Sequence, residues 1–206
     1  MKHTFDLLKT GEELNKATKA LVMVHGRGGS AVDIVRLAPH LSVDGYAVLA
    51  PQATNNSWYP HSFMVPTIQN EPWLTAALQV MEQTVQQILD AGIDTEHIYF
   101  FGFSQGACLT LEFLARNARK YGGAAAIIGG LIGETIQQER YHGDFGQMPI
   151  LLATSHPDFH VPQMRVHESA EILRGLHADV TEKIYEHAGH TILQEEIDLA
   201  NRLIFR

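Results

Sequence analysis

The chain has 206 residues, of which 45% are hydrophobic and 18% are charged, and its formal net charge is −8. This size and composition predict a single globular domain, residues 1–206, with a substantial hydrophobic core. The acidic balance and the lack of any basic block exclude nucleic acid and anionic membrane surfaces from the expected partners.

The N-terminal residues 1–10 lack the apolar core of a signal peptide, and no apolar run approaches the roughly 18 residues of a membrane span. The single cysteine, Cys108, cannot form an internal disulfide bond, which suits a reducing compartment. We therefore expect a cytoplasmic protein without stable membrane insertion. The sequence leaves open whether the chain forms a homodimer.

Strand-like and helix-like patterns alternate along the chain. Continuous apolar runs bounded by turn residues are typical of strands that are buried on both faces. The predicted strands cover residues 5–8, 20–25, 46–50, 98–101, 123–128, 148–153 and 179–185. The predicted helices cover residues 31–41, 72–91, 107–119, 163–176 and 193–204. This alternation predicts an α/β fold with one doubly wound, mostly parallel sheet, whose reactive groups gather at the carboxyl ends of the strands.

A long segment, residues 51–72, interrupts the alternation and is rich in Pro, Asn and aromatic residues. Loops of this length in compact domains are usually either functional or disordered. Trp58, Tyr59 and Phe63 make this one too aromatic for disorder. We therefore interpret it as an ordered wall of a binding site.

The stretch Gly102-Phe-Ser-Gln-Gly106 lies between a predicted strand and a predicted helix. Gly-x-Ser-x-Gly in this setting is the nucleophile-elbow pattern, in which the serine occupies a strained turn and exposes its hydroxyl at the top of the sheet. Side chains two positions before and after Ser104 would collide with neighbouring elements, and glycine removes them. Ser104 is therefore the predicted nucleophile.

A serine nucleophile needs a base that removes its proton and a carboxylate that orients the base. The predicted base is His190, in the loop before the last predicted helix, and its rival is His187. The predicted acid is Asp158, in the loop after the sixth predicted strand. Glu134 and Asp144, which follow the preceding strand, are weaker candidates. The order serine, acid, histidine is the one found in α/β-hydrolases.

The negative charge that develops during attack on an ester requires two backbone donors. The amide of Gln105 is one predicted donor, because it lies at the start of a helix whose dipole assists it. The amide of Arg27, in the glycine-rich loop His25-Gly-Arg-Gly, is the other. A phosphate-binding loop is the alternative, but residues 26–30 match neither the Walker pattern nor the dinucleotide fingerprint.

The triplet His156-x-Asp158-x-His160 admits a second interpretation, a metal site completed by His187 or His190. The proline inside the triplet and the lack of a second clustered motif weaken this hypothesis. It also leaves the Gly-x-Ser-x-Gly pattern unexplained.

Four short motifs occur in order from about residue 20 to the C-terminus: His25-Gly-Arg-Gly, Gly102-Phe-Ser-Gln-Gly106, Asp158-x-x-Val-Pro162 and Gly189-His190-x-Ile192. Together they resemble the phospholipase/carboxylesterase family of small serine α/β-hydrolases, which includes acyl-protein thioesterases. The resemblance implies an α/β-hydrolase fold and assigns the roles of nucleophile, acid, base and oxyanion donors to Ser104, Asp158, His190, Arg27 and Gln105.

The chain departs from the family pattern at two places. Members commonly carry His-Gly where this chain has Thr154-Ser155, and often Leu where it has Arg27. The Arg27 side chain either binds an anionic group of the substrate or points to solvent. These departures affect the choice of substrate and not the chemistry.

We predict hydrolysis of small or flexible acyl esters through an acyl-enzyme on Ser104, without a metal or an organic cofactor. Only about twenty residues are available where larger hydrolases insert a helical cap, so the cleft is expected to be open. Its predicted walls contain Trp58, Tyr59, Phe63, Ile132 and Phe159. The alternatives are a lysophospholipase or acyl thioesterase with the same triad, a metal-dependent hydrolase and a non-catalytic binding protein. A dienelactone hydrolase would carry cysteine at position 104.

Overall fold

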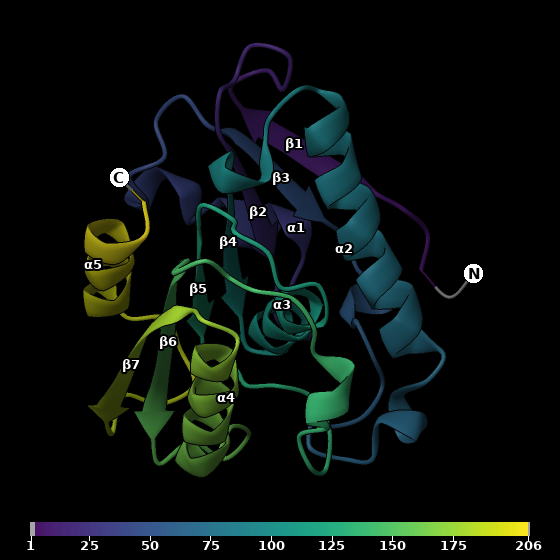
Figure 1. The fold of residues 1–206 in the computed structure, drawn as a ribbon, viewed down its shortest axis with the longest axis vertical. Coiled ribbons are helices and arrows are strands. Elements are labelled where there is room, and N and C mark those ends of the chain that lie inside the picture. Colours follow the sequence, from purple (N-terminus) through teal and green to yellow (C-terminus); the bar gives the residue numbers. More distant parts are fainter. Residues whose placement is uncertain (1–2, 206) are drawn as a thin grey trace.

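The structure, a computed structural model, describes residues 3–205. Its centre is a seven-stranded sheet in the order β1-β3-β2-β4-β5-β6-β7 (Figure 1). The strands are β1 (Leu7–Gly11), β2 (Ala20–Val24), β3 (Ala47–Pro51), β4 (Ile98–Phe103), β5 (Gly123–Ile127), β6 (Pro149–His156) and β7 (Asp179–Glu186). β1 pairs with β3 in antiparallel fashion, and the other neighbouring pairs are parallel. The predicted mostly parallel sheet is therefore confirmed.

The helices cover both faces of the sheet, as a doubly wound fold requires. They are α1 (Ala31–Val35), α2 (Trp73–Asp90), α3 (Gln105–Arg116), α4 (Gln163–Gly175) and α5 (Gln194–Leu203). α2, α3 and α4 lie on the near face in Figure 1, and α1 and α5 lie on the far face. Asn201 of α5 bonds the amide of Ser42 and the carbonyl of His40, which ties α5 to the segment that follows α1.

The first helix is much shorter than the predicted range 31–41. α1 begins after Ser30, whose side chain accepts a hydrogen bond from the amide of Asp33, and it ends at Val35. Pro39 explains the early end, because in a continuous helix its ring would clash with the carbonyl four residues earlier and it has no amide hydrogen to donate. The chain instead forms a 3-10 turn over Ala38–His40.

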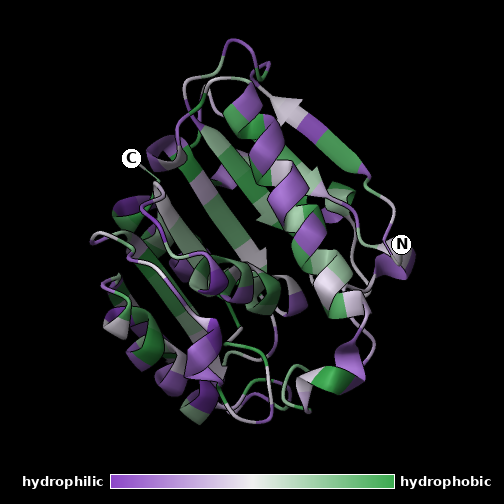
Figure 2. Ribbon diagram, turned by 45° about the vertical axis from the view of Figure 1, so that its right-hand side comes forward, coloured by the Kyte–Doolittle hydropathy of each residue, from purple (hydrophilic) through white to green (hydrophobic). Residues whose placement is uncertain are grey.

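The hydrophobic core lies along the central strands. Every residue of β2 is fully buried, and Ile98, Phe100 and Phe101 of β4 are buried as well. Figure 2 shows hydrophobic residues on the strands and hydrophilic residues on the outward faces of the helices. This pattern follows from a parallel sheet covered on both faces. No helix within residues 3–205 is both long enough and apolar enough to cross a membrane.

The parallel arrangement brings the ends of several strands to one edge of the sheet, where the loops after β2, β4, β6 and β7 meet. β5 and β6 are joined by residues 128–148, which contain a 3-10 turn over Gln138–Arg140 and no α-helix. This described connection carries no cap domain, so the edge of the sheet is left open.

Candidate active site

Ser104 occupies a sharp turn between β4 and α3. Its backbone is strained, with φ of 53° and ψ of −120°, and α3 begins at the next residue. A Cβ atom added to Gly102 would lie 2.7 Å from the carbonyl oxygen of Gly106, and one added to Gly106 would lie 2.5 Å from the carbonyl oxygen of His25. Neither position therefore accommodates a side chain, which is why the turn needs both glycines.

The loops after β4, β6 and β7 bring together Ser104, Asp158 and His190. The Ser104 hydroxyl lies 2.8 Å from Nε2 of His190, and Nδ1 of His190 lies 2.8 Å from Oδ2 of Asp158. An ionised Asp158 accepts from Nδ1, which leaves Nε2 free to accept the serine proton. The other carboxylate oxygen, Oδ1, accepts from the amides of His160 and Val161, both at 2.8 Å.

The environment of Asp158 favours its charged form. Its side chain is fully buried, and burial alone would raise the pKa. The hydrogen bonds from His190 and from two backbone amides outweigh burial, so the pKa lies below its ordinary value. The carboxylate is therefore ionised at neutral pH and stabilises positive charge on the adjacent imidazole.

The rival residues make other contacts. Asp144 binds the ring of His177 at 2.8 Å, and the carbonyl of Glu134 accepts from Arg165. The amide of His187 donates to the carbonyl of His156, which anchors the loop that carries His190. The structure thus places Asp158, and not the weaker candidates, against His190.

Two neighbouring rings confine the imidazole of His190. The ring centroid of Phe103 lies 5.5 Å from it, and that of His160 lies 5.1 Å away in an edge-on arrangement. The sequence pattern indicates His160 only as part of a possible metal-binding triplet. Its position two residues after Asp158 is the signal that would have placed it here. No three His, Cys, Asp or Glu side chains of the described chain are grouped as a metal site requires.

The glycine-rich loop after β2 runs directly beside Ser104. A Cβ atom added to Gly26 would lie 3.3 Å from Cβ of Ser104, so the next amide, that of Arg27, is close to the serine. On the other side, Gln105 is the first residue of α3, and the first amides of a helix have no partner within it. Both predicted oxyanion donors thus belong to segments that border the serine.

Hydrogen bonds from the side chains of His25 and Trp58 fix the conformation of this loop. Nδ1 of His25 donates to the carbonyl of Gly26 at 2.8 Å, and Nε2 accepts from the amide of Ala53 at 3.1 Å. Burial lowers the pKa of His25, which suits a neutral ring that donates and accepts at once. The indole nitrogen of Trp58 donates to the carbonyl of His25 at 2.9 Å. These contacts fix the backbone on which the Arg27 amide depends.

A cavity of about 690 Å³ opens above Ser104. It is lined by Arg27, Tyr59, Pro60, His61, Ser62, Phe63, Ser104, Gln105, Cys108, Phe159, His160, Val161 and His190. Three of the predicted wall residues, Tyr59, Phe63 and Phe159, are among them. Trp58 and Ile132 are not, which corrects the prediction for these two residues. Trp58 is fully buried against His25, and Ile132 is buried with its amide bonded to Glu112.

Cys108, expected to be a buried and inert thiol, borders the cavity from α3. Its side chain is buried, and burial raises its pKa to about 12. The amide of Gly130 approaches its sulfur at 3.5 Å. The thiol is therefore protonated and contributes volume, not reactivity, to the floor of the cavity.

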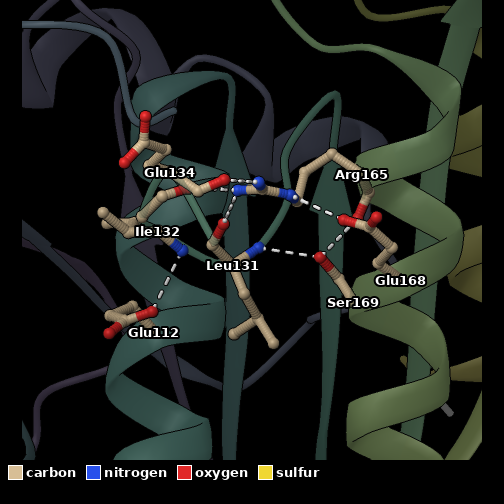
Figure 3. Close-up of polar contacts among 8 residues, drawn as sticks. Glu112, Leu131, Ile132, Glu134, Arg165, Glu168 and Ser169 are labelled. Carbon is tan, nitrogen blue, oxygen red and sulfur yellow. Dashed lines mark hydrogen bonds and ion pairs between the residues drawn. The ribbon is translucent and has the colours of Figure 1, made fainter. Parts of the chain in front are cut away.

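Buried charged and polar side chains fix the loop after β5 (Figure 3). Glu112 of α3 accepts from the amide of Ile132 at 3.1 Å. Arg165 of α4 donates to the carbonyl groups of three loop residues: Leu131, Gly133 and Glu134. The amide of Gly133 then donates to the carbonyl of Phe63 at 2.7 Å. The loop is therefore a fixed support for one wall of the cavity.

Comparisons with known proteins bear on the family and the fold of the chain. The family model described as phospholipase/carboxylesterase matches residues 8–204. A solved phospholipase/carboxylesterase from Dyadobacter fermentans is 50% identical, with a TM-score of 0.99 over 100% of this chain and 99% of the solved chain. The carboxylesterase of Bacillus cereus shares the fold at 19% identity, with a TM-score of 0.78 over 96% of this chain and 92% of the solved chain.

A curated relative matches part of the sequence. Acyl-protein thioesterase 1 of Gibberella zeae is 34% identical over 116 residues, which make up 55% of this chain and 49% of the relative. The chain spans about half the length of the curated relatives it matches. The family model, in contrast, covers nearly the whole sequence. The chain therefore belongs to the phospholipase/carboxylesterase family.

Proposed function

We propose that this protein is a serine carboxylesterase that hydrolyses small or flexible acyl esters through an acyl-enzyme on Ser104. The observation that carries the proposal is the continuous contact from Ser104 through His190 to Asp158, with both distances at 2.8 Å. The contact begins at a strained serine between a strand and a helix, which is the geometry of an activated nucleophile. The family membership supports the same reaction class.

In the proposed cycle, Ser104 attacks the ester carbonyl carbon while Nε2 of His190 takes the hydroxyl proton. The amides of Arg27 and Gln105 stabilise the negative charge on the carbonyl oxygen. His190 then gives its proton to the leaving alcohol. A water molecule, deprotonated by His190, attacks the acyl-enzyme, and His190 returns that proton to the Oγ of Ser104 as the acid is released. Asp158 stays ionised throughout and stabilises the imidazolium. The cycle requires no metal and no organic cofactor.

The shape of the site supports small or flexible substrates. The cavity is open, because the connection between β5 and β6 carries no cap, and it holds about 690 Å³. Tyr59 and Phe63 offer apolar surface for a short acyl chain, while Phe159 is almost completely exposed at the rim. A preference for bulky multi-ring esters over short acyl chains would contradict this substrate class.

An acyl thioesterase is the second candidate, because one relative carries that name. A lysophospholipase would use the same residues, as the family description allows. Both alternatives share the acyl-enzyme and differ only in the leaving group. Matched oxygen and sulfur esters of one acyl chain distinguish esterase from thioesterase, and a lysophospholipid substrate tests the third activity.

Ser104 is expected to be the reactive hydroxyl of the site. A fluorophosphonate is expected to label Ser104, as mapped by mass spectrometry, and Ser104→Ala is expected to lose labelling and to reduce kcat on the order of 10⁴-fold or more. A chelator is expected to leave both readouts unchanged. Activity that the chelator abolishes would favour a metal-dependent hydrolase, and the absence of both labelling and turnover would favour a non-catalytic binding protein.

A further inference from the structure

The side chains of Arg27 and Gln105 both bind the same short stretch of the long loop, residues 57–61, which we call the wall segment. The wall segment forms no helix or strand, so its backbone polar groups need partners from elsewhere. Three of its residues line the cavity, as do the next two residues of the chain. Whatever fixes the wall segment therefore fixes one side of the space that an acyl group would enter.

Gln105 binds the wall segment from the floor of the cavity. Its side-chain oxygen accepts from the amide of Trp58 at 2.9 Å, and its side-chain nitrogen donates to the carbonyl of Tyr59 at 2.8 Å. The side chain is buried, and without it the amide of Trp58 would lose its partner, while the carbonyl of Tyr59 would keep only the hydroxyl of Ser57, at 3.0 Å. One carboxamide thus pairs with backbone groups of two successive residues, as a neighbouring strand would in a sheet.

Arg27 binds the rest of the wall segment from the rim. One terminal nitrogen, Nη1, donates to the hydroxyl of Ser57 at 2.9 Å and to the carbonyl of Pro60 at 3.0 Å. The other, Nη2, donates to the carbonyl of His61 at 2.7 Å. The guanidinium carbon also lies 5.9 Å from the centroid of the Tyr59 ring, within the range of a cation–π contact. A planar group with several fixed donors suits three acceptors at once, whereas a lysine ammonium presents a single point charge.

These contacts answer the question that the sequence left open about Arg27. Its guanidinium is directed at protein acceptors, so the side chain neither extends freely into solvent nor presents an unused receptor for an anionic substrate. The residue is nevertheless exposed, and its hydrogen bonds therefore compete with water. Its expected effect is consequently moderate, acting on the shape of the cavity more than on the stability of the fold.

We propose that the Arg27 side chain is a positioning residue that sets acyl-group selectivity by holding the wall segment against the cavity. The inference rests on the proposed esterase function, because selectivity is read from ester hydrolysis. It assigns two separate tasks to one residue. In the proposed cycle the backbone amide of Arg27 stabilises the oxyanion, and the side chain shapes the acyl side of the same site.

The test uses Arg27→Met, which keeps the backbone amide but removes the donors, and Arg27→Lys, which keeps the charge. Arg36→Met is the matched control, because Arg36 lies after α1 with a side chain that is 75% exposed and forms an ion pair with its neighbour Asp33, at 3.8 Å. Hydrolysis is measured with 4-nitrophenyl acetate, butyrate, benzoate and hemisuccinate. Butyrate and hemisuccinate present acyl chains of equal length, without and with a carboxylate. Active sites are titrated with the fluorophosphonate, so a smaller folded fraction does not change the ratios.

In Arg27→Met, the preference for acetate over benzoate in kcat/KM is expected to fall by roughly three- to tenfold, mainly through KM, because a loosened wall contacts short acyl groups less well. Arg27→Lys is expected to fall in between, and Arg36→Met to keep the wild-type ratio. Butyrate and hemisuccinate are expected to change together. Should Arg27→Met fail to fold, the smaller change in Arg27→Lys decides the question.

Two results would overturn the inference. One is an acyl profile in the Arg27 variants identical to that of the wild type. The other is a selective loss of hemisuccinate, which would make Arg27 a receptor for anionic substrates. Failure of the proposed function itself is a different result, because it would appear as a wild-type protein that is neither labelled at Ser104 nor active on any of the four esters.

Discussion

At the scale of single residues, the same contact occurs at two places with different surroundings. Asp158 binds His190 and Asp144 binds His177, each at 2.8 Å. The Asp158 side chain is fully buried, whereas that of Asp144 is 60% exposed. Only the buried pair also reaches a serine on a strained turn. A carboxylate–imidazole contact therefore indicates a catalytic site only when the carboxylate is buried and the second ring nitrogen contacts a nucleophile.

The surface pair provides a control for a prediction about the buried one. Asp158→Asn is expected to lower kcat by on the order of a thousandfold or more with a small change in KM, because a neutral amide neither fixes the reactive tautomer nor stabilises the imidazolium. Asp144→Asn removes the same type of contact and is expected to keep wild-type kinetics. Steady-state kinetics on 4-nitrophenyl acetate measure both. Equal losses in the two variants would contradict a catalytic role for Asp158.

At the scale of elements, the sequence predicts what depends on local pattern. The apolar runs of the central strands and the Gly-x-Ser-x-Gly turn were recognisable because each has a local physical cause. The predicted helix over residues 31–41 is longer than α1, because the pattern of apolar residues continues past Pro39. The orientation of the Trp58 side chain is not predictable, since loop side chains follow no periodicity. Its indole nitrogen donates to the carbonyl of His25, which follows β2. The Asp158-x-x-Val-Pro162 motif indicates the acid, but only the tertiary structure shows that Asp158, and not Glu134 or Asp144, contacts His190.

Two glycines at element ends give opposite predictions. Gly106→Ala is expected to lower the free energy of unfolding by about 3 kcal/mol or more, because the new methyl group would collide with backbone at the end of β2. Gly175, the last residue of α4, has no atoms within 4 Å of an added Cβ. Gly175→Ala is therefore expected to raise the free energy of unfolding by about 0.5–1 kcal/mol. Urea titration of both variants tests the pair, and a tolerated Gly106→Ala would refute the crowding argument.

At the scale of the whole molecule, the burial of Glu196 makes the free energy of unfolding depend on pH. Glu196, in the first turn of α5, is buried, and its carboxylate accepts from the amide of Leu193 at 2.8 Å. Burial raises the pKa of Glu196 to about 7, although the amide contact opposes the shift. The unfolded chain releases this proton at a lower pH than the folded chain does. The free energy of unfolding is therefore expected to fall as pH rises from about 4.5 to about 7.

Glu196→Gln tests this linkage. Glutamine still offers an oxygen to the amide of Leu193 but does not titrate, so the variant is expected to lose less stability than the wild type between pH 5 and pH 8, and to be more stable at pH 8. Glu195→Gln changes the exposed neighbour and is expected to keep the wild-type dependence. The measurement is chemical denaturation at several pH values. Parallel pH curves for the wild type and Glu196→Gln would show that burial of this carboxyl has no such effect.

The strand order separates the supports of the proposed catalytic residues. His190 follows β7, an edge strand of the sheet, whereas Ser104 follows the central β4. β7 is only half-buried, so local opening at that margin would separate His190 from Ser104 while the interior stays intact. If the proposed esterase activity holds, inactivation on warming is therefore expected to precede the loss of secondary structure.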